Sequence, residues 1–257
     1  MLAKWYKTPL GRQVAAAEGI CLERLLADAF GPYLLQFGCA GQFAEVMAAT
    51  RIRQRVVLGE TPCAHADDAQ IQASPYLLPL ASASVDAVLL PHTLDFSRDP
   101  HRVLREVERV LIAEGRLYVL CFNPLSAWGL LRAVPRRRRR VPWCGGQLSP
   151  LRIADWLRLL GFQIDERQML VFRPPMTRAR AARVDWMERI GGRYWPLLGG
   201  VYVLSAVKRV TAMTPLRPSW TKSPGLLPGG ALKPTARQTT VRQTTARQRA
   251  ARSHERE

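Results

Sequence analysis

The chain has 257 residues, 47% of them hydrophobic, and a formal net charge of +18 at pH 7. This length allows one good hydrophobic core and roughly one to two domains. No apolar run approaches the ~20 residues of a membrane-spanning helix, and the N-terminus lacks the apolar stretch of a secretory signal.

The cysteines favour a reducing environment. The five cysteines are scattered, without a C-x-x-C pair or a Cys/His cluster. This pattern predicts neither a disulfide framework nor a metal site. We therefore expect a cytoplasmic protein with no bound metal.

The first third of the chain predicts alternating helices and strands. Residues 11–30 place most of their apolar side chains on one helical face, and Pro32 ends this helix. We expect strands over residues 33–37, 55–58 and 71–72, and a helix over residues 43–49.

The middle of the chain predicts a strand, a helix and a second strand. The first strand covers residues 85–90. Asp99 then caps a helix with Pro100 at its first position, where no backbone N–H is needed. We expect this helix to end at Glu114-Gly115, with Gly115 in the left-handed turn, and the next strand to cover residues 117–121. A unit of this length favours a parallel crossover.

The C-terminal part of the predicted domain continues the alternation. Ser149 caps a helix that has Pro150 at its first position and Gly161 after its end. Strands are predicted over residues 162–166 and 201–207. The alternation indicates a doubly wound α/β sheet, but the pattern alone leaves the strand order open.

The last segment of the chain is basic and polar. From Val207 onward it holds eleven Lys and Arg residues against two acids, and the motif RQTT occurs twice. We expect the chain to be disordered from Met213, because too little apolar surface is present to offset the entropy of folding. A weak contact with nucleic acid is one interpretation. A solvated extension is favoured, because no aromatic residues interleave the arginines.

The sequence of residues 78–120 resembles that of a known protein family. The segment LPLASASVDAVLLPHTLDFSRDPHRVLREVERVLIAEGRLYVL resembles the second half of the class I S-adenosylmethionine (SAM)-dependent methyltransferases, in the type-11 group that includes the ubiquinone-biosynthesis C-methyltransferases. LPHTLDF and FNPLSAWGL are similar to segments of a bacterial subgroup of these proteins. The resemblance covers Trp5 to Arg209.

The resemblance implies a fold and a domain organisation. It implies a Rossmann-like, seven-stranded, mostly parallel sheet whose last strand is antiparallel and inserted beside the sixth. We expect an N-terminal helical segment over residues 1–30, a methyltransferase domain over 31–209 with a cap insertion at about 123–148, and the basic tail over 213–257.

The resemblance also implies a SAM site at the carboxyl ends of the strands. The family has an acid and a glycine-rich motif after strand one, and the matching positions here are Gln36, Gly38, Cys39 and Ala40. Gln36 replaces the acid. Gly38 allows a sharp turn and a close approach of the ligand.

Two further family positions would contact the nucleoside of SAM. Glu60 matches the acid that binds the ribose hydroxyls, because a carboxylate accepts two hydrogen bonds; Asp67 or Asp68 is an alternative. Ser74 replaces the acid that binds adenine, so this contact would come from its hydroxyl or from backbone groups near Tyr76-Leu77. Leu77, Leu78 and Pro91 complete the predicted cofactor site.

The predicted chemistry centres on His92, which follows the strand at 85–90. A neutral imidazole there could accept a proton, although a hydrogen bond within its own turn is the alternative. Asn123 and Trp128 are candidate substrate residues. In the predicted cap, Arg136–Arg140 could meet an anionic partner or remain a solvated loop.

We therefore predict a SAM-dependent methyltransferase with a small-molecule or RNA acceptor. One alternative is a non-catalytic, methyltransferase-like protein that binds nucleic acid or a partner through its basic segments. A dinucleotide-binding oxidoreductase is a further alternative, less favoured because the glycine fingerprint matches poorly.

Overall fold

The structure is a computed structural model. It describes residues 2–38, 40–59, 69–131, 142, 144–146, 148–175, 185–195 and 197–210. All of them belong to one compact unit, Met1–Ala212, whereas the unit Met213–Glu257 lies outside the described residues. Four other parts of the sequence prediction also lie outside them: Cys39, Glu60, Asp67-Asp68 and Arg136–Arg140.

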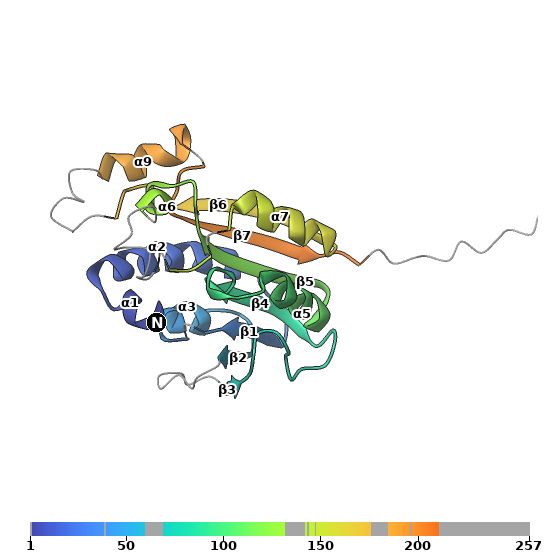
Figure 1. The fold of residues 1–257 in the computed structure, drawn as a ribbon. Coiled ribbons are helices and arrows are strands. Elements are labelled where there is room, and N and C mark those ends of the chain that lie inside the picture. The colour runs from blue at the N-terminus through green and yellow to red at the C-terminus, as the bar shows by residue number, and fades with distance from the viewer. Residues whose placement is uncertain are drawn as a thin grey trace, which may run out of the picture. The chain divides into compact units, whose positions relative to one another are not determined.

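A seven-stranded sheet forms the centre of this unit (Figure 1). Its spatial order is β3 (Ala69–Gln72), β2 (Gln54–Gly59), β1 (Tyr33–Phe37), β4 (Val85–Pro91), β5 (Leu111–Phe122), β7 (Val201–Lys208) and β6 (Phe162–Leu170). Strand β7 is antiparallel to both of its neighbours, and the pairs from β3 to β5 are parallel. The predicted doubly wound sheet, with its last strand inserted beside the sixth, is confirmed.

Helices cover both faces of the sheet, and each face has its own hydrophobic core. On one face the core includes residues of α1 (Leu2–Tyr6), α2 (Pro9–Leu26) and α3 (Ala44–Ala48). On the other face it includes residues of α4 (Thr93–Phe96), α5 (Pro100–Val110) and α7 (Pro150–Leu159). The two N-terminal helices therefore pack in the same core as the sheet, although the sequence predicted residues 1–30 as a segment before the domain.

Side-chain caps begin the longer helices. Asp99 accepts a hydrogen bond from the Arg102 N–H at the start of α5, and Ser149 accepts one from the Arg152 N–H at the start of α7. Both predicted caps are confirmed. Each satisfies a backbone donor that the first helical turn leaves free. No helix in the described ranges is long and apolar enough to cross a membrane.

The predicted end of α5 is wrong. The helix ends at Val110, and β5 begins at once with Leu111, which pairs with Val85 of β4 before the register shifts. Glu114, not Gly115, has the left-handed backbone, with φ 62°. A Cβ on Gly115 would overlap the Leu111 side chain. Gly115 therefore permits close packing inside β5. In the sequence, a glycine with this role looks the same as a glycine that ends a helix.

Candidate functional site

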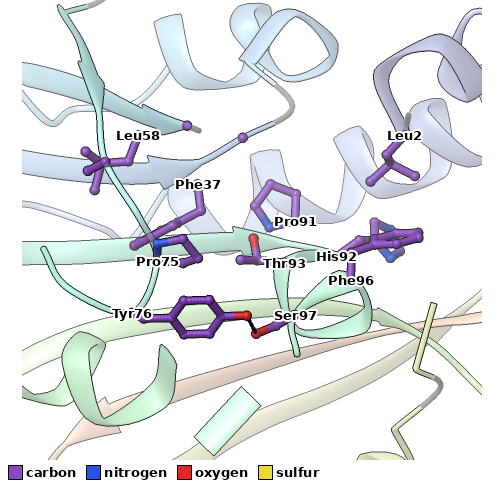
Figure 2. Close-up of a pocket in the computed structure, with 13 residues that line it drawn as sticks. Leu2, Phe37, Leu58, Pro75, Tyr76, Pro91, His92, Thr93, Phe96 and Ser97 are labelled. Carbon is purple, nitrogen blue, oxygen red and sulfur yellow. Dashed lines mark hydrogen bonds between the residues drawn. The ribbon is translucent and has the colours of Figure 1, made fainter. Parts of the chain in front are cut away.

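A cavity of about 410 Å³ lies at the carboxyl ends of β1, β2 and β4 (Figure 2). Its wall is mostly apolar and aromatic, with a few hydroxyl groups. The lining residues are Leu2, Phe37, Gly38, Leu58, Gly59, Ala73, Pro75, Tyr76, Pro91, His92, Thr93, Phe96 and Ser97. In a doubly wound sheet this edge is where ligands bind.

The turn after β1 is held by its own residues. Gly38 has φ 55°, and its N–H donates to the Leu58 carbonyl at 2.6 Å, which ties the turn to β2. The Gln36 side chain is buried and donates to the Gly38 carbonyl at 2.9 Å. Gln36 thus braces the turn from behind. A Cβ at position 38 would meet no atom of the described residues within 4 Å, so this side of Gly38 is open toward them.

Tyr76 forms the opposite wall. Its hydroxyl lies 3.0 Å from the Ser97 hydroxyl and accepts a hydrogen bond from the Arg98 N–H at 2.8 Å. The Ser74 hydroxyl accepts a long bond of 3.4 Å from the Tyr76 N–H. Ser74 therefore shapes the loop that carries Tyr76 to the cavity.

The next two residues of this loop point elsewhere. Leu77 is 70% exposed and Leu78 is buried, and neither lines the cavity. The Leu78 N–H donates to Glu106, whose carboxylate also pairs with Arg109. The Arg109 guanidinium donates to the Leu78 carbonyl, so α5 holds the loop.

His92 is the centre of a fully buried polar network. It follows β4 with φ 55°, and its ring stacks on Phe122 at 4.0 Å between centroids. Nδ1 lies 3.0 Å from Asp95 Oδ2, and Nε2 lies 2.8 Å from Glu18 Oε1. The Tyr6 hydroxyl donates to the other Glu18 oxygen at 2.7 Å. The network joins α1 and α2 to the end of β4.

The two carboxylates set the protonation of His92. Burial alone would lower its pKa, but Glu18 and Asp95 outweigh this effect and raise the pKa to about 9. Burial also raises the pKa of Asp95. A His92 that is protonated at neutral pH donates from both nitrogens. Its role as a proton acceptor stays a prediction, and this geometry argues against it.

The two predicted substrate residues are structural in their contacts. Asn123 is buried, and its Nδ2 donates to the Leu197 and Gly199 carbonyls at 2.7 and 2.9 Å. Trp128 is also buried and donates to the Arg173 carbonyl at 2.9 Å. Neither residue lines the cavity.

The structure thus brings three of the predicted site residues, Gly38, Pro91 and His92, to one cavity. Ala40 lies just beyond, in a single 3-10 turn, Ala40–Gln42. Sequence reasoning missed the aromatic lining residues Phe37 and Phe96. Phe37 could have been found from its place directly before Gly38, at the end of a predicted strand.

Comparison with known proteins agrees with this architecture. Residues 35–119 match the family model described as a methyltransferase domain. The chain is 37% identical over 159 residues to the uncharacterized protein YafS of Escherichia coli K12; the match covers 60% of this chain and 61% of YafS. The chain thus spans about three fifths of that relative's length.

Solved structures share the fold at low sequence identity. A SAM-dependent methyltransferase of Thermotoga maritima, described as a possible histamine N-methyltransferase, has a TM-score of 0.57 at 18% identity, covering 80% of this chain and 94% of that one. The [4+2]-cyclase SpnF has a TM-score of 0.54 at 19% identity, covering 78% and 81%. Residues 35–119 thus match the methyltransferase domain model, and the seven-stranded sheet has the strand order of the class I SAM-dependent methyltransferase fold.

Proposed function

We propose that this protein is a SAM-dependent methyltransferase and that the cavity beside Gly38 binds SAM. The observation that carries the proposal is the position of the cavity, at the carboxyl ends of β1, β2 and β4 and next to a left-handed glycine. This is the edge at which doubly wound sheets bind nucleotide-like ligands.

The residues present fit such a cofactor. The cavity volume of about 410 Å³ lies in the range of small-molecule sites, roughly 300–1,000 Å³. The open side of Gly38 lets a ligand contact the backbone. Glu60 follows Gly59, a lining residue, and is the proposed partner of the ribose hydroxyls. Backbone groups near Tyr76 are the proposed adenine contact, where Ser74 replaces the family acid.

When bound, SAM would supply an electrophilic methyl group, and the protein would act mainly by orientation. Phe37, Tyr76 and Phe96 would shield the site from water. We assign His92 a positioning role, in which its bonds to Glu18 and Asp95 fix the turn at the end of β4. Orientation of the reactants alone lowers the activation barrier of a transfer reaction considerably. Methyl transfer is therefore compatible with a His92 that does not accept a proton. The acceptor is a small molecule or RNA, and the site of action is the cytoplasm.

Calorimetry with SAM and with its demethylated product tests the proposal. Gly38→Asn is the informative variant, because asparagine tolerates a left-handed backbone better than other side chains do. We expect the variant to keep its melting temperature within a few degrees and to lose at least about tenfold in SAM affinity, because the added amide enters the ligand space. Wild-type protein that binds neither compound would refute the proposal.

A second candidate is a methyltransferase-like protein that catalyses a different reaction or none. It is favoured by Gln36, which braces the turn where the family has an acid. The likeness to a cyclase also illustrates that this fold hosts other activities. SAM binding without methyl transfer to any supplied small-molecule or RNA acceptor would support this candidate.

A further inference from the structure

An exposed apolar surface lies beyond the carboxyl end of β5, at the same edge of the sheet as the cavity. We define the apolar patch as Leu125, Trp186, Tyr194, Trp195, Leu197 and Leu198, which come from the segment before α6 (Ala127–Leu130) and from α9 (Asp185–Tyr194) with the residues after it. Tyr194 is 67% exposed, Trp186 49%, and Leu197 and Leu198 46% each. Isolated exposed apolar residues are ordinary, but a cluster of them marks an interaction site.

Ring contacts and hydrogen bonds connect the two parts of the apolar patch. The Trp186 and Trp195 rings lie 6.2 Å apart in an edge-to-face arrangement. The Leu198 N–H donates to the Trp195 carbonyl. Asn123 then links the parts, because it donates to the Leu197 carbonyl and accepts a hydrogen bond from the Leu125 N–H. Figure 1 shows α6 and α9 at the same end of the sheet.

Hydrogen bonds and close packing hold the backbone beneath the apolar patch. Backbone hydrogen bonds join Gly200 to Val171 and to Asn123, both at 2.9 Å. A Cβ at Gly200 would overlap the ring of buried Trp128. Fixed backbone beneath exposed large side chains is the arrangement of a preformed binding surface.

Helix α9 packs a glycine against the domain and exposes two large aromatic side chains. Gly191 of α9 is buried, and a Cβ on it would lie 2.6 Å from the Phe172 Cβ. The helix thus contacts the domain through a glycine, while Trp186 and Tyr194 stay exposed. A helix on a soluble protein normally buries its large apolar residues. Trp186 and Tyr194 are instead exposed, which is the arrangement of a surface that contacts a partner.

The composition of the patch and of the sequence beside it favours a lipid surface as the partner. Tryptophan and tyrosine beside leucine suit the boundary between lipid headgroups and acyl chains. Arginine-rich sequence flanks the patch on both sides: Arg136–Arg140 follow α6, and Arg178, Arg180 and Arg183 precede α9. Anionic headgroups attract such clusters. Single-stranded RNA would use the aromatic rings but not the leucines.

We propose that the apolar patch docks this protein onto an anionic lipid bilayer. The ends of β4 and β5 lie together, with Pro91 paired to Leu120, so the patch and the cavity share one edge of the sheet. Docking would bring the cavity near the membrane surface. An amphiphilic acceptor held in the bilayer is then the fitting substrate class, an extension that rests on the proposed methyltransferase function.

Vesicle flotation with the full-length protein tests docking without SAM or catalysis. Vesicles of phosphatidylcholine are compared with vesicles of phosphatidylcholine and phosphatidylglycerol, at low and at physiological salt. The patch variant combines Trp186→Ser, Leu197→Ser and Leu198→Ser. The matched control combines Phe30→Ser, Leu151→Ser and Leu159→Ser, which are exposed apolar residues outside the patch.

We expect the wild type and the control to float with the anionic vesicles and the patch variant to lose roughly tenfold or more in affinity at physiological salt, where charge attraction is screened. All three proteins should keep the same melting temperature and the same SAM affinity by calorimetry. Unaltered SAM binding would separate a failure of docking from a failure of the proposed function.

Several results would overturn the proposal. Wild-type protein that ignores anionic vesicles would do so, as would a patch variant that binds them as tightly as the control. Equal losses in the patch variant and the control would also refute it. A variant that loses affinity for single-stranded RNA, or loses dimerisation, while still binding vesicles would assign the patch to that partner instead.

Discussion

Replacing Glu18 with glutamine should remove most of the pH dependence of stability that His92 confers. Glu18 Oε1 lies 2.8 Å from His92 Nε2 in a fully buried site, and Glu18 is the main group that raises the His92 pKa. Glutamine has nearly the same shape and can still accept one hydrogen bond, but it carries no charge. The Glu18→Gln variant therefore tests the charge more than the packing.

The magnitude follows from the shift in the His92 pKa. The folded value of about 9 lies above the ordinary value of 6.5, so folding favours the protonated form. The resulting stability is fully present below pH 6.5 and is lost as the pH rises through 9. At 1.36 kcal/mol for each pKa unit, the wild type should lose about 3 kcal/mol of unfolding free energy across this window.

Denaturant unfolding at pH 6.5 and pH 9 measures this loss directly. In Glu18→Gln, Asp95 is the one described residue whose carboxylate still faces the ring, so the difference between the two pH values should fall to below about half of the wild-type difference. Glu166→Gln is the matched control, because Glu166 pairs with Arg24 in an exposed position and should leave the pH dependence unchanged. A wild type equally stable at both pH values, or a Glu18→Gln variant with the full wild-type loss, would refute the reasoning.

Two further predictions concern the packing of the domain. Asn123→Ala leaves the Leu197 and Gly199 carbonyls and the Leu125 N–H without their partner, so the unfolding free energy should drop by about 2–4 kcal/mol in a denaturation assay. In the same assay the control Gln163→Ala, at an exposed position, should cost less than about 0.5 kcal/mol. Deletion of residues 213–257 should change the melting temperature by no more than about 2 °C and leave SAM affinity intact, because β7 ends at Lys208; an insoluble truncated protein would show that the tail is needed for folding.

Local signals explain which parts of the fold could be predicted. Strand β1 was placed at its observed bounds, and the caps at Asp99 and Ser149 were identified, because each depends on a few adjacent residues. The end of α5 failed because its cause is not local. The break at Val110 comes from the pairing of Leu111 with Val85, and this pairing is not visible in the segment itself.

The candidate site could be predicted only for residues whose role shows in the adjacent sequence. Gly38 and Pro91 were found because they lie at the carboxyl ends of strands that end at one edge of the sheet. Glu18 was missed because it lies in an amphipathic helix 74 residues from His92, where an acid normally faces solvent. Leu2 was missed because no pattern places the first helix over the cavity.

The buried network also constrains the chemistry that the cavity can perform. Among the described lining residues, His92 is the only one whose side chain ordinarily titrates near neutral pH, and its nitrogens already contact Glu18 and Asp95. An acceptor atom with a free lone pair at neutral pH, such as a pyridine-type ring nitrogen, needs no base. We therefore expect the pH–rate profile of methyl transfer to lack an inflection near pH 6.5 that belongs to His92. An inflection there that disappears in His92→Gln, with SAM affinity unchanged, would establish His92 as the base.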